Sequence, residues 1–242
     1  YLDLFQFHNI ATDEELKQVL APDGAMKAVR EAMAVGKIKH IGFSSHNIDT
    51  AVRVCQTGLF STIQFPFNFI EKEPLDELFQ VAREFDMGII AMKPLGGGLL
   101  ESAALCFKYL QQYPDIVPIP GISTREELDE ILALYESPQS LSQVDKDEIE
   151  RIRTDLGKDF CHRCRYCLPC EQEVQISDVM IFRSMAARLA PNVAVALSKG
   201  AMESVDNCTD CEECLAKCPY NLAIPEIIRE QRKNFDQIAS QF

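Results

Sequence analysis

The sequence has 242 residues, of which 47% are hydrophobic, and a formal net charge of −13 at pH 7. The acidic excess argues against nucleic acid or an anionic membrane surface as a partner. No apolar run approaches the roughly 20 residues of a membrane-spanning helix, and no secretory signal is visible at the start, so we expect a cytoplasmic protein without membrane or nucleic-acid partners.

Short apolar runs alternate with amphipathic helical stretches over the first 136 residues. Strands are predicted at 2–7, 38–43, 62–65, 88–92 and 117–119, and helices at 24–35, 48–56, 75–85, 102–112 and 124–135. Units of about 30 residues with this alternation indicate a parallel sheet with right-handed connections. Five units are compatible with an open doubly wound sheet and with part of a (β/α)8 barrel, which needs eight. The first strand is not followed by G-x-G-x-x-G, which argues against a Rossmann-type sheet.

Polar residues stand where the predicted strands end. They are His8, Ser44, Ser45, Lys93 and Ser123, with Gln64 inside the third strand and Gly121 just after the fifth. In parallel α/β sheets the ligand lies beyond the carboxyl ends of the strands. A single residue such as His8 is more often structural at such a position, but several in register indicate a binding site.

The rest of the chain is predicted to be mainly helical. Helices are expected at 145–156, around 179–189, and at 224–239, where Pro225 suits the first turn. A cysteine-rich sequence begins just after the first of these helices. We therefore divide the chain into an α/β domain, 1–156, and a smaller domain, 157–242.

Eight of the ten cysteines form two closely spaced runs. The runs are C-x2-C-x2-C-x2-C at Cys161, Cys164, Cys167 and Cys170, and C-x2-C-x2-C-x3-C-P at Cys208, Cys211, Cys214 and Cys218. In bacterial ferredoxins the second spacing holds one 4Fe–4S cluster through three cysteines, and the fourth cysteine ligates the other cluster. Two clusters are therefore predicted. The first three cysteines of the first run would share one cluster with Cys218, and the first three of the second run would share the other with Cys170.

Other interpretations of the cysteines are weaker. Disulfides do not suit C-x2-C repeats, and zinc would leave half of each run unexplained. The first run is one residue shorter than the second and continues with Glu171 rather than proline, so a single cluster is an alternative. The clusters could also serve to stabilise a thin helical core. Cys55 and Cys106 lie in predicted apolar helices and are interpreted as buried thiols.

Five blocks of sequence occur in order along the first 132 residues. They read YLDLFQFHN, GKIKHIGFSSHN, TIQFPFNFIE, GIIAMKPLGGG and PIPGISTREELDEIL. Together with the cysteine runs, they resemble the aldo/keto reductase family, in the branch with a C-terminal 4Fe–4S ferredoxin-type domain. The resemblance implies a partial (β/α)8 TIM barrel of five βα units, followed by a mainly helical ferredoxin-type domain. An unclosed barrel would expose strand edges that favour association, and the oligomeric state is open.

The same resemblance implies reduction of a small-molecule carbonyl substrate by NADPH. Of the family's Tyr, Lys, Asp and His set only the histidine has a counterpart, His8, which would orient the carbonyl. The first strand here would be the family's fourth, so about three βα units before Tyr1 would be missing. We therefore expect the full-length form to be an oxidoreductase and this chain alone to be inactive.

The family's nicotinamide-cofactor site would also map onto this sequence. Ser45 replaces a frequent asparagine, Met92 a stacking tyrosine, and Glu127 a glutamine, so the preference for NADP over NAD is open. Arg125 is the candidate for a 2′-phosphate contact, although it could equally be part of a solvated first helical turn. The implied cofactor-binding residues are Ser44, Ser45, Gln64, Met92, Lys93, Leu95, Gly96, Ser123, Arg125 and Glu127.

Two functional hypotheses of different classes follow. The first is an NAD(P)-dependent oxidoreductase coupled to iron–sulfur electron transfer, with a redox protein as partner. Nicotinamide transfers two electrons as a hydride, whereas a 4Fe–4S cluster passes one at a time, and no flavin motif is present to mediate. The second hypothesis is a non-catalytic electron-transfer or redox-sensing protein on a barrel scaffold.

Overall fold

The computed structural model describes residues 1–156 and 159–242, which form two compact units. The first comprises Tyr1–Gly96 and Ser102–Lys146, and the second comprises Gly97–Glu101 and Asp147–Phe242. The predicted domain boundary after residue 156 lies ten residues beyond the main point of division. Each unit is described by itself below.

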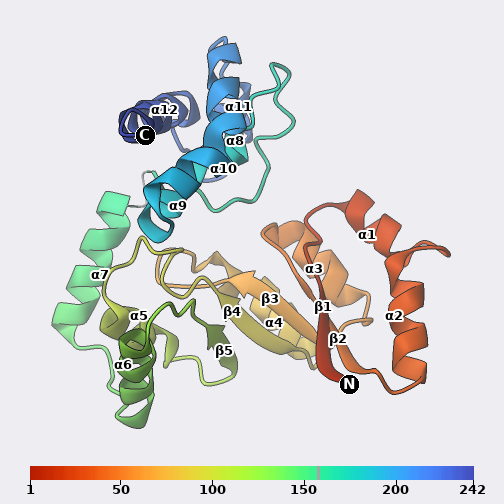
Figure 1. The fold of residues 1–242 in the computed structure, drawn as a ribbon. Coiled ribbons are helices and arrows are strands. Elements are labelled where there is room, and N and C mark those ends of the chain that lie inside the picture. The colour runs from red at the N-terminus through yellow and green to blue at the C-terminus, as the bar shows by residue number, and fades with distance from the viewer. Residues whose placement is uncertain (157–158) are drawn as a thin grey trace. The chain divides into compact units, whose positions relative to one another are not determined.

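A five-stranded parallel sheet forms the centre of the first unit (Figure 1). Neighbouring strands follow one another in chain order, and all four pairs are parallel. The strands are β1 (Leu2–Phe7), β2 (Ile38–Ser44), β3 (Thr62–Pro66), β4 (Gly88–Met92) and β5 (Ile116–Ile119). Each predicted strand is present, and the predicted α/β fold is confirmed.

One face of this sheet is apolar and almost fully closed to solvent. Phe7, Phe43, Ile63, Ile89 and Ile116 are in register across the five strands, and none is more than 7% exposed. Because side chains alternate along a strand, the residues next to these point to the other face. That other face carries the polar side chains of the predicted site, so the register of the hydrophobic core determines their position.

Six α-helices connect the strands or follow them. The predicted helix 75–85 is divided, because a 3-10 turn at Glu73–Leu75 precedes the α-helix. The prediction missed α1, although its capping box between Thr12 and Glu15 is visible in the sequence. The helices are α1 (Asp13–Leu20), α2 (Ala25–Ala34), α3 (Ile48–Gln56), α4 (Leu78–Glu84), α5 (Ala103–Leu110) and α6 (Arg125–Glu136).

Helices also build the second unit, apart from the two cysteine runs. The long helix α7 (Gln143–Leu156) has residues in both units, and the predicted helix 179–189 is two helices that meet at Ile181. The prediction missed α10, in which Pro191 occupies the first turn. The other helices are α8 (Ile176–Met180), α9 (Phe182–Arg188), α10 (Pro191–Glu203), α11 (Glu213–Lys217) and α12 (Ile224–Ala239). None of the helices in the described ranges is both long enough and apolar enough to cross a bilayer.

Candidate iron–sulfur centre and strand-end site

The two cysteine runs repeat one backbone conformation. In the first, Arg163 and Arg165 have φ angles of 61° and 65°. In the second, Asp210 and Glu212 have φ angles of 57° and 60°. These residues precede and follow the second cysteine of each run, so the left-handed positions correspond one to one. Residues other than glycine rarely adopt this conformation, and its recurrence shows that the two runs share the same backbone feature on either side of their second cysteine.

The first run and the last cysteine of the second run meet at one pocket. Cys161, Cys164, Cys167 and Cys218 all line it. The ring of His162 stacks on that of Tyr220, with centroids 3.6 Å apart and planes 4° from parallel. This contact joins the residue after Cys161 to the residue two positions after Cys218, and so holds together the segments that carry these thiols.

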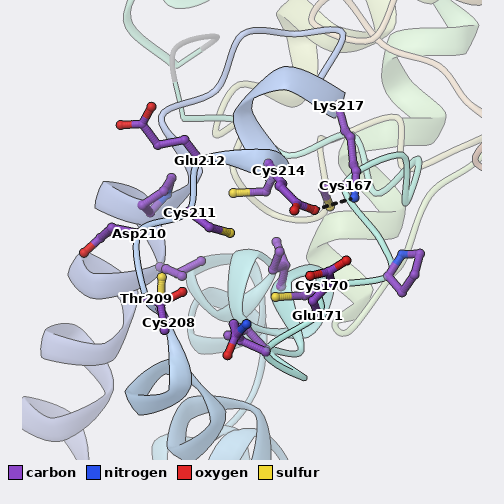
Figure 2. Close-up of a pocket in the computed structure, with 17 residues that line it drawn as sticks. Cys167, Cys170, Glu171, Cys208, Thr209, Asp210, Cys211, Glu212, Cys214 and Lys217 are labelled. Atoms are coloured by element: carbon purple, nitrogen blue, oxygen red, sulfur yellow. Dashed lines mark hydrogen bonds and ion pairs between the residues drawn. The ribbon is translucent and has the colours of Figure 1, made fainter.

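A second pocket receives the other cysteines. Figure 2 shows the sulfur atoms of Cys170, Cys208, Cys211 and Cys214 around a common space, with Cys167 at its edge. Because Cys167 lines both pockets, the two sites adjoin. The structure therefore groups the eight thiols three plus one and three plus one, as the reciprocal scheme requires. Eight soft thiolate donors in this arrangement fit two 4Fe–4S clusters chemically.

Burial strongly affects the thiols of the first pocket. It raises the pKa of Cys161 to about 11, while a hydrogen bond from the backbone N–H of Arg163 acts in the opposite direction. Burial also raises the pKa of Cys167 to about 12, with a further increase from the neighbouring thiols. These side chains would be protonated at neutral pH in the absence of metal. Binding of iron must therefore release protons, which makes metal affinity pH-dependent.

The cysteine runs lie directly on the hydrophobic core of the second unit. That core includes Val179, Phe182, Met202 and Ile228, and six of the eight cysteines pack against it. Within the described residues, no three His, Cys, Asp or Glu side chains converge on a single metal ion. A 4Fe–4S cluster does not require this, because each of its irons binds only one cysteine. Cys55 and Cys106 are buried in the first unit, and burial raises the pKa of each to about 12, in keeping with inert thiols.

In the first unit, three predicted cofactor residues converge at the carboxyl ends of β2, β3 and β4. Ser44 is in register with Gln64, whose Nε2 lies 3.7 Å from the sulfur of Met92. The hydroxyl of Ser44 is buried, and no hydrogen-bond partner for it lies within the described part of the chain. A buried hydroxyl of this kind needs a partner, and a ligand amide at the strand ends would provide one.

Sequence reasoning missed Gln6, which reaches Gln64 across the intervening strand. The Nε2 of Gln6 donates to the Oε1 of Gln64 at 2.8 Å. Gly42 lies between them on β2, and a Cβ there would stand 2.0 Å from the hydroxyl oxygen of Thr62. The absence of a side chain at Gly42 thus leaves room for the amide bridge. Gln6 was detectable in the sequence only as a polar residue within a strand.

The other predicted residues around the strand ends differ in their surroundings. His8 is exposed just after β1. Ser45 is fully buried, and its hydroxyl donates to the carbonyl of Asn47 at 3.3 Å. Lys93 has a φ of 55°, and its backbone carbonyl accepts a hydrogen bond from the side chain of Asn68. The backbone N–H of Gly96 donates to the same carbonyl and so closes a turn, in which Leu95 is half-buried.

The residues at the start of α6 are engaged with one another. Glu127 accepts from the backbone N–H of Ser123 at 2.6 Å and completes a capping box with Thr124. Arg125 is highly exposed and lies 3.7 Å from Asp129, one helical turn away. Local helix capping thus accounts for Glu127 without a ligand, and the predicted cofactor roles of these residues remain predictions.

Comparison with known proteins finds a separate match for each part of the chain. Residues 1–105 match the model of the aldo/keto reductase family, and residues 160–223 match a 4Fe–4S dicluster domain. The chain is 28% identical over 98 residues to "Probable aldo-keto reductase 1" of Glycine max, and the match covers 40% of this chain and 27% of that protein. The chain thus spans about a quarter of that relative's length.

A solved structure agrees on the fold. The holo form of aldo-keto reductase AKR11C1 from Bacillus halodurans has a TM-score of 0.50 to this chain at 15% identity, covering 63% of this chain and 61% of that one. At this identity the likeness shows a shared fold.

Proposed function

We propose, for a chain whose residues 1–105 match the aldo/keto reductase family and whose residues 160–223 match a 4Fe–4S dicluster domain, the function of an NAD(P)-dependent oxidoreductase coupled to iron–sulfur electron transfer. Its substrate would be a small carbonyl compound, and its clusters would exchange electrons with a redox protein partner. The observation that carries the proposal is the distribution of eight cysteines over two adjoining pockets, with Cys167 lining both.

The clusters supply one-electron transfer when bound. This chain's own part is to hold them through thiolates and to limit the access of water. The loops with left-handed residues direct backbone N–H groups at the sulfur atoms, as the hydrogen bonds from Arg163 to Cys161 and from Tyr166 to Cys164 illustrate. Such bonds stabilise negative charge on sulfur and tune the redox potential.

The cluster part is tested by iron and acid-labile sulfide analysis of anaerobically purified protein, with EPR of the reduced state. About eight irons and eight sulfides per chain are expected for two clusters. Cys170→Ser and Cys218→Ser are each expected to remove the cluster opposite their own run, whereas Cys106→Ala, which changes a buried thiol far from the runs in sequence, should retain all the iron. About four irons in the unaltered protein would rule out the second cluster, and zinc without sulfide would rule out both.

The nicotinamide part uses the strand-end residues. Nicotinamide supplies a hydride when bound. Ser44 offers its unpaired buried hydroxyl to the carboxamide. Gln6 holds the oxygen of Gln64, which leaves the Gln64 amide N–H groups facing Met92, a weak acceptor that a carboxamide oxygen can replace. His8, exposed after β1, would orient the substrate carbonyl.

Fluorescence of bound NADPH tests this assignment directly. Gln64→Leu is expected to weaken binding by about tenfold, the effect of losing one good hydrogen bond of about 1.4 kcal/mol. Arg125→Gln should weaken binding of NADPH but leave that of NADH unchanged, because only NADPH carries the 2′-phosphate. Unchanged NADPH binding in Gln64→Leu would refute the strand-end site.

One observation favours a second candidate function. The carboxylate of Glu127 is committed to helix capping and the guanidinium of Arg125 lies beside Asp129, so neither residue needs a cofactor to explain it. A protein that binds both clusters but no NADPH would be a non-catalytic electron-transfer or redox-sensing module. In that case His8→Ala would leave every cluster-dependent activity intact.

A further inference from the structure

The two cysteine runs share a backbone but carry opposite charges at the shared positions. The left-handed residues are Arg163 and Arg165 in the first run and Asp210 and Glu212 in the second. Since the left-handed residues stand on either side of the second cysteine in both runs, each arginine corresponds in position to an acid of the other run. The two loops therefore differ mainly in the charge that they carry beside the second cysteine.

The lining of the two pockets extends this contrast. The first pocket is lined by Arg165 and by no Asp or Glu side chain among the described residues. The second pocket is lined by four carboxylates and one ammonium group (Figure 2). These are Glu171, Asp210, Glu212, Glu213 and Lys217.

Two ion pairs reduce the acidic charge of the second pocket without removing it. Lys217 lies 3.2 Å from Glu213, and Arg229 pairs with Asp210. Glu171 and Glu212 remain as further exposed carboxylates of the lining. Glu212 is therefore the most informative acid to change, and Arg165 is its counterpart in the first run.

We propose that these charges give the two cluster sites different reduction potentials, with the site of Cys161, Cys164, Cys167 and Cys218 the higher. The inference rests on the proposed function, in that it requires both clusters. Reduction adds one electron to a cluster that is already held by four thiolates. Positive charge nearby stabilises this more negative state, and carboxylates destabilise it.

Solvent exposure acts in the opposite direction. Among the cysteines that line the second pocket, Cys211 is exposed, and water stabilises the reduced state there. The charge contrast comprises two arginines against two acids at matched positions, whereas the exposure concerns one of four thiolates. We therefore expect charge to determine the order. The first electron that the protein accepts would then reside at the cluster site of the first pocket, and this transfer forms and breaks no bond.

The test is an anaerobic potentiometric titration of the holoprotein, with dithionite as the one-electron donor and EPR of the reduced clusters as the readout. Arg165→Asn and Glu212→Asn are the matched variants, because asparagine tolerates the left-handed conformation that both positions require. Arg165→Lys keeps the charge. Lys199→Gln removes a charge from α10 at a residue that lines neither pocket.

Two separate reduction steps are expected in the unaltered protein. Arg165→Asn should shift the higher step to more negative potential and leave the other in place. Glu212→Asn should shift only the lower step to more positive potential, so each variant narrows the gap. Arg165→Lys and Lys199→Gln should retain the original steps. Raising the ionic strength should also narrow the gap, since exposed charges are screened.

The possible outcomes distinguish a failure of this inference from a failure of the two-cluster proposal on which it rests. The inference would be overturned, and the two-cluster proposal retained, by either of two results in protein that holds eight irons. In one, Arg165→Asn shifts the potential of the lower step; in the other, neither variant shifts any potential. About four irons with a single reduction step would overturn both. If Arg165→Asn loses iron and Arg165→Lys does not, the Glu212→Asn variant decides. The inference is overturned if the lower reduction step of Glu212→Asn has the same potential as in the unaltered protein.

Discussion

The two units of this protein reach a defined structure by different means. In the first, apolar side chains in register across five strands form a core that needs no ligand. In the second, the loops that carry the cysteines contain little regular structure beyond the five-residue helix α11. They include four residues other than glycine in the left-handed conformation. Hydrophobic burial thus specifies one unit, whereas metal ligation is expected to complete the other.

The largest expected effect follows from removing iron. Oxidative chelation should unfold the cysteine loops and loosen α8 and α12, which pack on the same core, because ligation supplies much of the folding free energy of a small metal domain. Hydrogen exchange by mass spectrometry is the measurement. Peptides from 160–235 should lose protection, whereas peptides from β2, β3 and β4 should keep it. Equal protection of both units after iron loss would show that the second core is sufficient on its own.

A cavity in the core of the first unit should destabilise that unit and leave the second unit unaffected, the reverse of iron removal. Phe79 is fully buried on α4 and meets Phe67 edge to face, with ring centroids 5.1 Å apart. Phe79→Ala should cost about 3–5 kcal/mol of stability, measured from hydrogen exchange of β3 and β4 in urea. Iron content should not change. Phe85→Ala is the matched control on the same segment, because Phe85 is 41% exposed and its loss should cost far less. Parallel loss of iron in Phe79→Ala would contradict the independence of the two units.

The smallest expected effect is electrostatic and depends on pH. The guanidinium of Arg83 lies 2.6 Å from Asp115 and lowers the pKa of that carboxyl below its usual value of about 4. The stabilisation is therefore present near neutrality and is lost as the pH falls through the lowered pKa. Both side chains are more than 40% exposed, so Asp115→Asn should cost less than about 1 kcal/mol at pH 7.

Comparing the two proteins isolates this effect. Hydrogen exchange of β5 is followed in the unaltered protein and in Asp115→Asn from pH 7 to pH 3. Acid destroys iron–sulfur clusters in both proteins, so only the difference between them reports on Asp115. A difference that persists at pH 3, or that grows with acid, would show that the ion pair is not its source.

Much of the first unit could be predicted from alternation alone. Two of the five predicted strands, at 2–7 and 88–92, agree with the structure at both ends, as do the helices at 48–56 and 224–239. The misses have local causes. Helix α1 has only eight residues, none of them buried, and α10 begins with a proline that is typical of a break between elements. The helix predicted at 179–189 is two helices that meet at Ile181, and no sequence pattern at that position predicts the division.

The sequence by itself determined the expected chemistry of this protein: cysteine spacing predicted iron–sulfur ligation, and ordered blocks carried the resemblance to the aldo/keto reductases. The spacing predicted the reciprocal grouping but left a single cluster as an alternative, and only the tertiary structure placed Cys170 and Cys218 each at the pocket of the opposite run. It also decided that Gln6 bridges to Gln64 past Gly42, 58 positions apart in the chain. Spacing along a chain constrains neighbours, but contacts between distant residues depend on how the core brings their backbones together.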